Sequence, residues 1–469
     1  MNYKDCQEWK NVGFPLSTTS NEAAKMYDAA LTQFTTGYED KSIGGVGICL
    51  EKMLSADPSF VLGHAIKNGM ALLSGVSILT NDSLKSDIDK MVEMAKTSDI
   101  TPLEKLHVDA VKLWSVGNIV KGCDKWEEVL LYFPTDIMAI QGAMLTHLFY
   151  GRMMQFTDCL ARVLPFWNSC SSPKVHCAIR SQYAFGLEEL NFFDDAEKIA
   201  KQALEVTPND IWGTHTIAHV RESQNHYEEG ISFIKSKESD IQDNYLSGHI
   251  YWHLGLYYIE KGDFEAALTL YDDRLSKYLS NGAMVDMTDA SSFLCRLEFE
   301  GVNVGDRWQK VHEQFLPHLH DHVYMFNDIH GLMASQRAKQ FEVAEKLIES
   351  IKDFISNADE ENAKTQVFRD VGVSLCESFQ AYDNGEYGRA VDIMTPIKYR
   401  IQEIGGSKAQ RDVFNLFLIH AALKSSEKRH HMLARSLLHE RSAQRKCSPM
   451  NDRLFARLPL DMLVDPISE

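Results

Sequence analysis

The sequence predicts an all-α protein, a solenoid of helix pairs wound into a right-handed superhelix of about eleven pairs. Three observations lead to this prediction. The chain repeats with a period of about 34 residues, small residues recur at fixed places in the repeat, and no stretch alternates apolar and polar residues as a strand does. The 469 residues also exceed what one ordinary compact core holds, which favours a repeat array or several domains.

The repeat is clearest between residues 248 and 281. The small residues Gly255 and Ala267 allow two antiparallel helices to approach closely, while Tyr251 and Tyr271 fill the space beside them. Gly262 permits the tight turn between the two helices. This is the tetratricopeptide pattern, so we expect a solenoid of the tetratricopeptide type.

The same pattern defines a central array of five units with weaker units on either side. The five units start at Leu103, Ile137, Cys177, Ile211 and Gly248, and the weaker matches cover 27–60, 325–358 and 371–404. We therefore expect an N-terminal segment (1–26), degenerate helix pairs (27–102), central repeats (103–281), further degenerate helix pairs (282–445) and a C-terminal tail (446–469).

Several strings that the repeat does not require resemble the family of tetratricopeptide repeat protein 38. They comprise Pro15–Ala23 (PLSTTSNEA), His215–His219 (HTIAH), Tyr251–His253 (YWH), Phe326–Asp328 (FND), Gly405–Ser407 (GGS) and Gln410–Asn415 (QRDVFN). The resemblance therefore covers almost the whole chain. It implies an all-helical tetratricopeptide protein and brings no reaction or partner that could be carried over to these residues.

Charge and composition narrow the expected partners and location. The chain has 48 basic and 66 acidic residues, a formal net charge of −18, and this charge would repel a phosphate backbone, so no nucleic-acid partner is expected. No apolar stretch approaches the roughly 20 residues of a membrane span, so no membrane partner is expected either. The N-terminus has no signal or transit pattern and the nine cysteines form no Cys-x-x-Cys pair, which predicts reduced thiols and a cytoplasmic location.

The candidate site is a set of aromatic and acidic side chains on two neighbouring helices. The spacings of 3, 4 and 3 from Trp212 to Glu222 place four residues on one face of a helix. In tetratricopeptide arrays this face lines the concave groove. The unit that starts at Gly248 presents further residues at the corresponding places. The predicted groove residues are Trp212, His215, His219, Glu222, His249, Trp252 and His253.

Three interpretations of this set stay open. Histidine and tryptophan are common half-buried residues, so the set can belong to ordinary packing. Aromatic walls with a few polar groups are also typical of a pocket for a small molecule or peptide. Finally, histidines four residues apart can share one metal ion, with Glu222, His249 or His253 completing the ligands, although no His-Glu-x-x-His motif is present.

From the sequence we therefore expect a protein that binds a peptide, protein or small-molecule guest in its concave groove. The alternative is an enzyme or metal-dependent protein that uses His215, His219 and Glu222 together with His249 and His253. The sequence contains no established catalytic motif. It leaves enzymatic activity open, and it does not name a cofactor, a metal or an oligomeric state.

Overall fold

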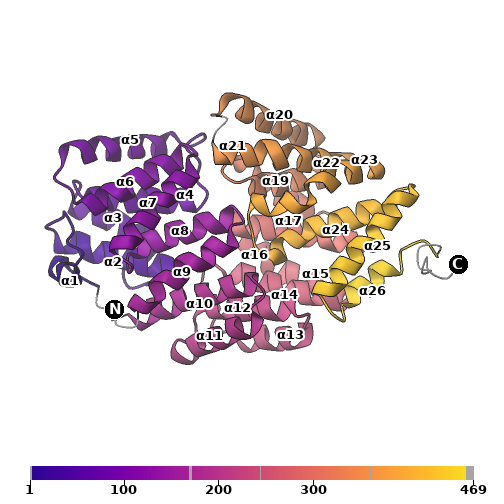
Figure 1. Cartoon of the computed structure of the whole chain (residues 1–469), viewed down its shortest axis with the longest axis horizontal. Coiled ribbons are helices and arrows are strands. Elements are labelled where there is room, and N and C mark those ends of the chain that lie inside the picture. The colour runs from indigo at the N-terminus through magenta and orange to yellow at the C-terminus, as the bar shows by residue number, and fades with distance from the viewer. Residues whose placement is uncertain (1–2, 168–171, 243, 360–361, 461–469) are drawn as a thin grey trace. The chain divides into compact units, whose positions relative to one another are not determined.

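The computed structural model describes residues 3–167, 172–242, 244–359 and 362–460, which form helix after helix along the chain (Figure 1). No strand forms within these ranges, where the β-type pairing consists of an isolated bridge between Tyr38 and Asn244. The predicted all-α class is confirmed. Within the same ranges, no helix combines the length and the apolar character that crossing a lipid bilayer requires.

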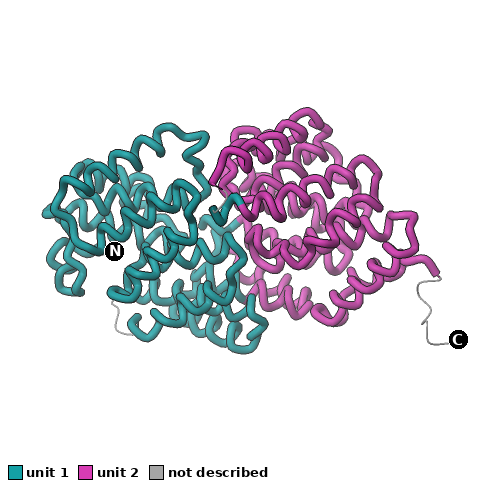
Figure 2. Tube along the Cα trace, turned by 45° about the horizontal axis from the view of Figure 1, so that its top comes forward, with its two compact units in different colours: residues 1–216, 240–247, 361–365 teal, residues 217–239, 248–360, 366–469 magenta. Residues whose placement is uncertain are grey.

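The chain divides into two compact units, coloured separately in Figure 2. Unit 1 comprises residues 1–216, 240–247 and 361–365, and unit 2 comprises residues 217–239, 248–360 and 366–469. Each unit therefore includes short segments that are remote in sequence from the rest of it.

Unit 1 contains eleven complete helices within the described residues. They are α1 (Cys6–Asn11), α2 (Asn21–Thr36), α3 (Gly45–Ala56), α4 (Val61–Leu73), α5 (Asp82–Thr97), α6 (Pro102–Ser115), α7 (Ile119–Tyr132), α8 (Ile137–Phe149), α9 (Met153–Trp167), α10 (Pro173–Glu189) and α11 (Phe193–Val206). Helix α12 (Ile211–Ser223) begins in unit 1 and ends in unit 2.

Unit 2 contains most of the remaining helices. They are α13 (Tyr227–Ser236), α14 (Ser247–Lys261), α15 (Phe264–Leu270), α16 (Ser276–Leu279), α17 (Met284–Phe299), α18 (Arg307–Phe315), α19 (Met325–Arg337), α20 (Phe341–Asn357), α21 (Ala363–Val367), α22 (Val373–Asp383), α23 (Tyr387–Met394), α24 (Lys408–Lys424), α25 (Lys428–Gln444) and α26 (Pro449–Phe455). Helices α14 and α21 cross the unit boundary, because Ser247 of α14 and residues 363–365 of α21 belong to unit 1. Short π-helical turns (Tyr271–Leu275, Phe368–Gly372) and 3₁₀ segments (Leu316–His318, Thr395–Ile404) interrupt the α-helices.

Consecutive helices are arranged as pairs joined by short turns. The described helices form eleven such pairs, namely α2/α3, α4/α5, α6/α7, α8/α9, α10/α11, α12/α13, α14/α15, α17/α18, α19/α20, α22/α23 and α24/α25. The first helices of the five central pairs begin within four residues of the predicted unit starts. The helix-pair solenoid predicted from the repeat is therefore confirmed.

Local chemistry sets where the helices begin and turn. Thr101 and Glu104 form a capping box around Pro102 at the start of α6, and the Asp136 carboxylate accepts a backbone N–H at the start of α8. The turn after α14 passes through Gly262 at a φ of 86°, in the left-handed region that favours glycine. These signals are readable in the sequence, which explains why the repeat frame could be placed from it.

Small residues let the helices approach, as the repeat pattern predicts. A Cβ atom added to Gly255 on α14 would lie 2.3 Å from the ring of Phe293 on α17, and one added to Gly142 on α8 would lie 2.4 Å from the ring of Trp126 on α7. Both distances are far below normal contact. Glycine is therefore required there by the packing of aromatic rings and not by the backbone conformation.

The segment predicted as a C-terminal tail includes the helix α26, which is attached to the body of unit 2. The Arg453 guanidinium donates to the carboxylate of Glu300 at 2.7 Å and to the carbonyl oxygens of Ile259 and Glu260 at the end of α14. Residues 461–469 of that predicted tail lie outside the described residues.

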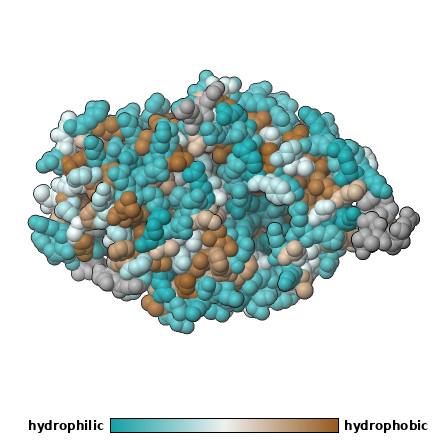
Figure 3. Space-filling model, in the orientation of Figure 1, coloured by the Kyte–Doolittle hydropathy of each residue, from teal (hydrophilic) through white to brown (hydrophobic). Residues whose placement is uncertain are grey.

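The surface drawn in Figure 3 is mainly hydrophilic, with small groups of hydrophobic residues between the polar ones. Exposed large apolar side chains come from many parts of the described chain, for example Leu131, Phe192 and Tyr399. Scattered apolar residues of this kind are normal on a folded protein, so they carry no functional argument.

Candidate functional site

Helices α12 and α14 carry all seven residues that the sequence singled out. None of them exposes more than 6% of its surface, so they belong to the interior and do not form an open wall. The unit boundary follows Thr216, which assigns Trp212 and His215 to unit 1 and the other five residues to unit 2.

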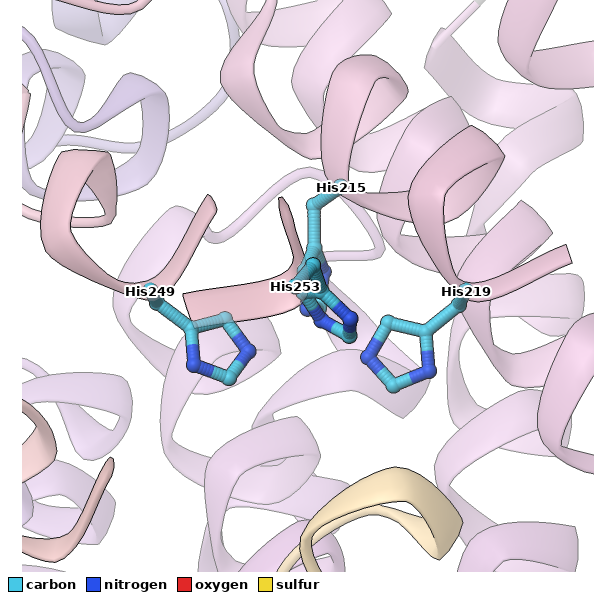
Figure 4. Close-up of side chains that lie close together, drawn as sticks. All are labelled: His215, His219, His249 and His253. Atoms are coloured by element: carbon cyan, nitrogen blue, oxygen red, sulfur yellow. The ribbon is translucent and has the colours of Figure 1, made fainter. Parts of the chain in front are cut away.

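Three imidazole rings of unit 2 lie against one another, and we call His219, His249 and His253 the histidine cluster. The His253 ring centroid lies 4.4 Å from that of His219 and 4.8 Å from that of His249, and the two outer rings are 6.5 Å apart. In Figure 4, His253 lies between the other two, and one ring nitrogen of His219 and one of His249 point toward it. The helical face predicted from the sequence therefore does collect imidazoles.

Two polar residues from other helices hold the orientation of His249. The Asp289 carboxylate on α17 lies 2.7 Å from Nδ1 of His249, and the Gln410 amide on α24 donates to the other oxygen of Asp289 at 3.4 Å. A carboxylate accepts the Nδ1–H of such a ring, so the lone pair is left on Nε2. The contact fixes both the tautomer of His249 and the direction of its ring.

Trp252 occupies a packed position beside the cluster. Its ring stacks on that of His249 at 5.1 Å and 16°, the Arg296 guanidinium lies 5.4 Å from its centroid, and its indole N–H donates to Ser292 at 3.2 Å. The side chain has no exposed surface. This is the environment of a core residue and not that of the aromatic wall of an open pocket.

In unit 1, Trp212 and His215 pack near Phe185. The Phe185 ring centroid lies 6.2 Å from that of Trp212 and 4.9 Å from that of His215. His215 precedes His219 by four residues on the continuous helix α12, which brings both to one side of that helix. Within unit 2, each of the three rings of the histidine cluster offers one nitrogen, and these nitrogens lie within 4.8 Å of one another.

This nitrogen set is close to, but looser than, a metal coordination shell. Nitrogens that bind one zinc ion tetrahedrally at about 2.0–2.1 Å lie about 3.3 Å apart. The rings would therefore have to close by at most about 1.5 Å around an ion. Imidazole is a ligand for zinc, copper, iron and nickel, so the donor chemistry fits that class of metal.

Glu222, predicted to face the same groove, lies in a different cluster of unit 2. Its carboxylate pairs with Arg445 at 2.5 Å, and Arg441 pairs with Asp412 beside it. Burial alone would raise the pKa of Asp412, but Arg441, Arg445 and Arg296 outweigh burial and hold that pKa below its usual value. A cavity of about 20 Å³, enough for one water molecule, adjoins this ionic cluster. Glu222 is thus committed to an ion pair and is not grouped with the imidazoles.

Sequence reasoning missed the residues that support the candidate site. Asp289 lies 40 residues from His249 in the sequence, and Gln410 lies 121 residues from Asp289. Arg445 lies 223 residues from its partner Glu222. One sequence signal was available, because Asp286 and Asp289 lie three residues apart, a spacing that places both on one face of a helix. An acidic pair on a buried helix calls for a buried polar partner.

Comparison with known proteins adds little to this description. No family model matches the chain. The human IFIT1 dimer with m7Gppp-AAAA is 12% identical over 96% of both chains at a TM-score of 0.36. A monomeric IFIT1 mutant with Gppp-AAAA is 13% identical over 95% of this chain and 96% of the other at a TM-score of 0.34. At these values the likeness supports no assignment of function.

One expectation from the sequence needs correction. A net charge of −18 was taken to exclude a nucleic-acid partner, and this exclusion does not hold. The two solved structures named above contain m7Gppp-AAAA and Gppp-AAAA, and a net charge alone does not decide what a local surface binds. Net charge is a sum over the whole chain, whereas a nucleic acid responds to the local charge of one surface. We therefore withdraw the exclusion.

Proposed function

We propose that this chain is a helical-repeat protein that binds one divalent transition-metal ion at His219, His249 and His253. The observation that carries the proposal is the convergence of three buried imidazoles from α12 and α14 within a single unit.

The contact between His249 and Asp289 supports this proposal over simple packing. Metal-binding histidines commonly donate their second ring N–H to a carboxylate, which orients the ring and makes the coordinating nitrogen a better ligand. Asp289 holds His249 in this way and is itself held by Gln410. The coordinating Nε2 would then face the other two rings, as Figure 4 illustrates.

Metal binding and guest binding are compatible in this proposal. Catalytic and ligand-binding zinc sites commonly have three protein ligands and keep one coordination position for a water or a small molecule. The expected guest would then be a small group that reaches the ion.

Metal content of the full-length protein tests the proposal directly. Protein purified without an affinity tag, loaded with zinc or cobalt and then dialysed, should carry about one ion per chain by elemental analysis. His219→Ala and His253→Ala should lose the ion, because two remaining imidazoles seldom hold one tightly. Asp289→Asn should weaken the affinity by about 10- to 100-fold without abolishing binding.

A matched control separates ligand loss from damage to the core. His420 is buried in unit 2, with a pKa lowered to about 3 chiefly by burial, and it stacks on Phe299 outside the cluster. His420→Ala should lower stability and leave the metal content unchanged. Wild-type protein that binds neither zinc nor cobalt would show that the cluster is a packing feature.

Two broader proposals accompany the metal site. We place the chain in the family of tetratricopeptide repeat protein 38, on the strength of the strings described above. We also propose a cytoplasmic location, which fits eight free cysteines in the described residues, six of them buried.

A further inference from the structure

The loop before α19 holds a second polar cluster in unit 2, apart from the histidine cluster. Within it His322 adopts a φ of 42°, in the left-handed region that residues other than glycine seldom occupy. His322 is 3% exposed, and its ring packs 5.5 Å from that of Phe354. Backbone strain of this kind persists only where surrounding contacts impose it, and it is concentrated at functional sites.

The contacts of the His322 ring form a chain that ends on a serine. Nδ1 of His322 lies 2.6 Å from the Asp328 carboxylate on α19, and Nε2 lies 2.8 Å from Oγ of Ser350 on α20. Oγ of Ser350 also lies 2.9 Å from Nδ1 of His320. Asp328 is buried, whereas Ser350 is half-buried, so the serine end of the chain faces outward.

The donors and acceptors of these hydrogen bonds are consistent with only one direction of donation, from Ser350 through His322 to Asp328. The Asp328 carboxylate can only accept, so Nδ1 of His322 donates to it and Nε2 carries the lone pair. Oγ of Ser350 then donates its proton to Nε2 of His322, and His320 donates to Oγ. This is the arrangement in which a histidine acts as base toward a serine hydroxyl while a carboxylate fixes its tautomer.

We propose that Ser350 is an activated nucleophile that forms a covalent ester with small electrophilic acyl or phosphonyl compounds. His322 acts as its general base, and Asp328 is the positioning residue. The motif is recognised by its geometry and its donor directions, because no sequence pattern announces it.

The reaction of Ser350 with an activated ester requires only the ester and, for its later hydrolysis, water. Oγ of Ser350 attacks the electrophilic carbon of an activated ester and its proton passes to Nε2 of His322. The new Oγ–C bond forms as the bond from that carbon to the leaving oxygen breaks, and His322 returns the proton to the leaving alcohol. Water can then cleave the ester by the same transfers, which releases the acid and restores the serine.

A fluorophosphonate probe tests the proposal on the full-length protein. Phosphorus forms a bond to Oγ of Ser350 as fluoride leaves, and peptide mass spectrometry then locates the label. Wild type should be labelled at Ser350, Ser350→Ala should lose that label, and Asp328→Asn should slow labelling by at least about 10-fold. Ser356→Ala, a substitution on the exposed side of the same helix, should label at Ser350 as wild type does.

The design guards against misfolded variants. His322→Asn keeps a residue type that tolerates the left-handed backbone, so its fold should survive while labelling falls, and circular dichroism checks this. Labelling should be the same with and without a metal chelator, which separates this site from the metal proposal. Folded wild type in which Ser350 reacts no faster than Ser356, or in which Asp328→Asn reacts at the wild-type rate, would overturn the inference.

Discussion

At the scale of single residues, Asp286 and Asp289 on α17 have opposite environments although they lie one turn apart. Asp289 is matched by His249 and Gln410, whereas Oδ1 of Asp286 has no hydrogen-bond partner among the described residues. Burial raises the pKa of Asp286 to about 7, and the nearby charge of Asp289 adds to this, while His249 opposes it. Burial thus favours the protonated, uncharged form of the Asp286 carboxyl.

Asp286→Asn should make the protein less sensitive to rising pH. In wild type the folded state binds this proton up to about pH 7, whereas the unfolded chain releases it near 3.8. The free energy of unfolding therefore falls as pH rises between these values. Asparagine removes this loss, so the variant should gain on the order of 2–4 kcal/mol relative to wild type between pH 4 and pH 8.

Chemical denaturation at several pH values measures this difference. The exposed Asp353→Asn on α20 is the matched control. A difference between Asp286→Asn and wild type that stays constant across this range would show that Asp286 is not a buried titrating group.

At the scale of helices, the distance between packed helices depends on single glycine residues, which have no Cβ atom. Gly255 on α14 leaves no room for a Cβ atom beside Phe293 on α17. By contrast, an added Cβ at Gly47 on α3 would meet no atom within 4 Å. Two helical glycines of the same chain therefore have opposite structural roles.

Alanine at these two positions should have opposite effects on stability. Gly255→Ala forces Phe293 or the helix backbone to move and should lower the free energy of unfolding by about 1–3 kcal/mol. Gly47→Ala removes backbone freedom from the unfolded chain and should be neutral or stabilising by up to about 1 kcal/mol. Thermal melting of both variants makes the comparison, and equal melting temperatures would mean that α14 and α17 are less closely packed than described.

At the scale of the whole molecule, sequence order and compact units do not coincide. Unit 1 includes the remote segments 240–247 and 361–365. Within it Asn244 pairs with Tyr38 in the isolated bridge, and the Asn362 amide donates to the carbonyl oxygen of Val116 at the end of α6 at 3.2 Å. Later parts of the chain thus complete an early unit.

Asn362→Ala should loosen the end of α6, although Asn362 lies 246 residues from Val116 in the sequence. Loss of this partly buried hydrogen bond should cost about 0.5–1.5 kcal/mol and increase amide exchange around Val116 and Gly117. Asn357→Ala, which removes a local bond to Asp353 on the exposed face of α20, is the control and should not affect that region. Unchanged exchange near Val116 would contradict the role of segment 361–365 in unit 1.

Much of the fold could be derived from the sequence, because its determinants are local. Helix caps, turn glycines and small residues at a fixed spacing act within one repeat or between neighbours, so the five central first helices and the eleven pairs followed from the pattern. The shared face of His215 and His219 followed from helical periodicity alone. Net charge, in contrast, is a sum over the whole chain and does not describe the local surface that a partner contacts.

Only tertiary structure decided which side chains meet. His249 and Asp289 come together because α14 packs beside α17, and Glu222 turned from a possible metal ligand into the partner of Arg445 because α25 returns to α12. The contacts of His322 with Asp328 and Ser350 likewise depend on a strained loop that no sequence pattern predicts. Periodicity determines the direction in which a residue faces, but the partner it meets depends on how helices remote in sequence pack together.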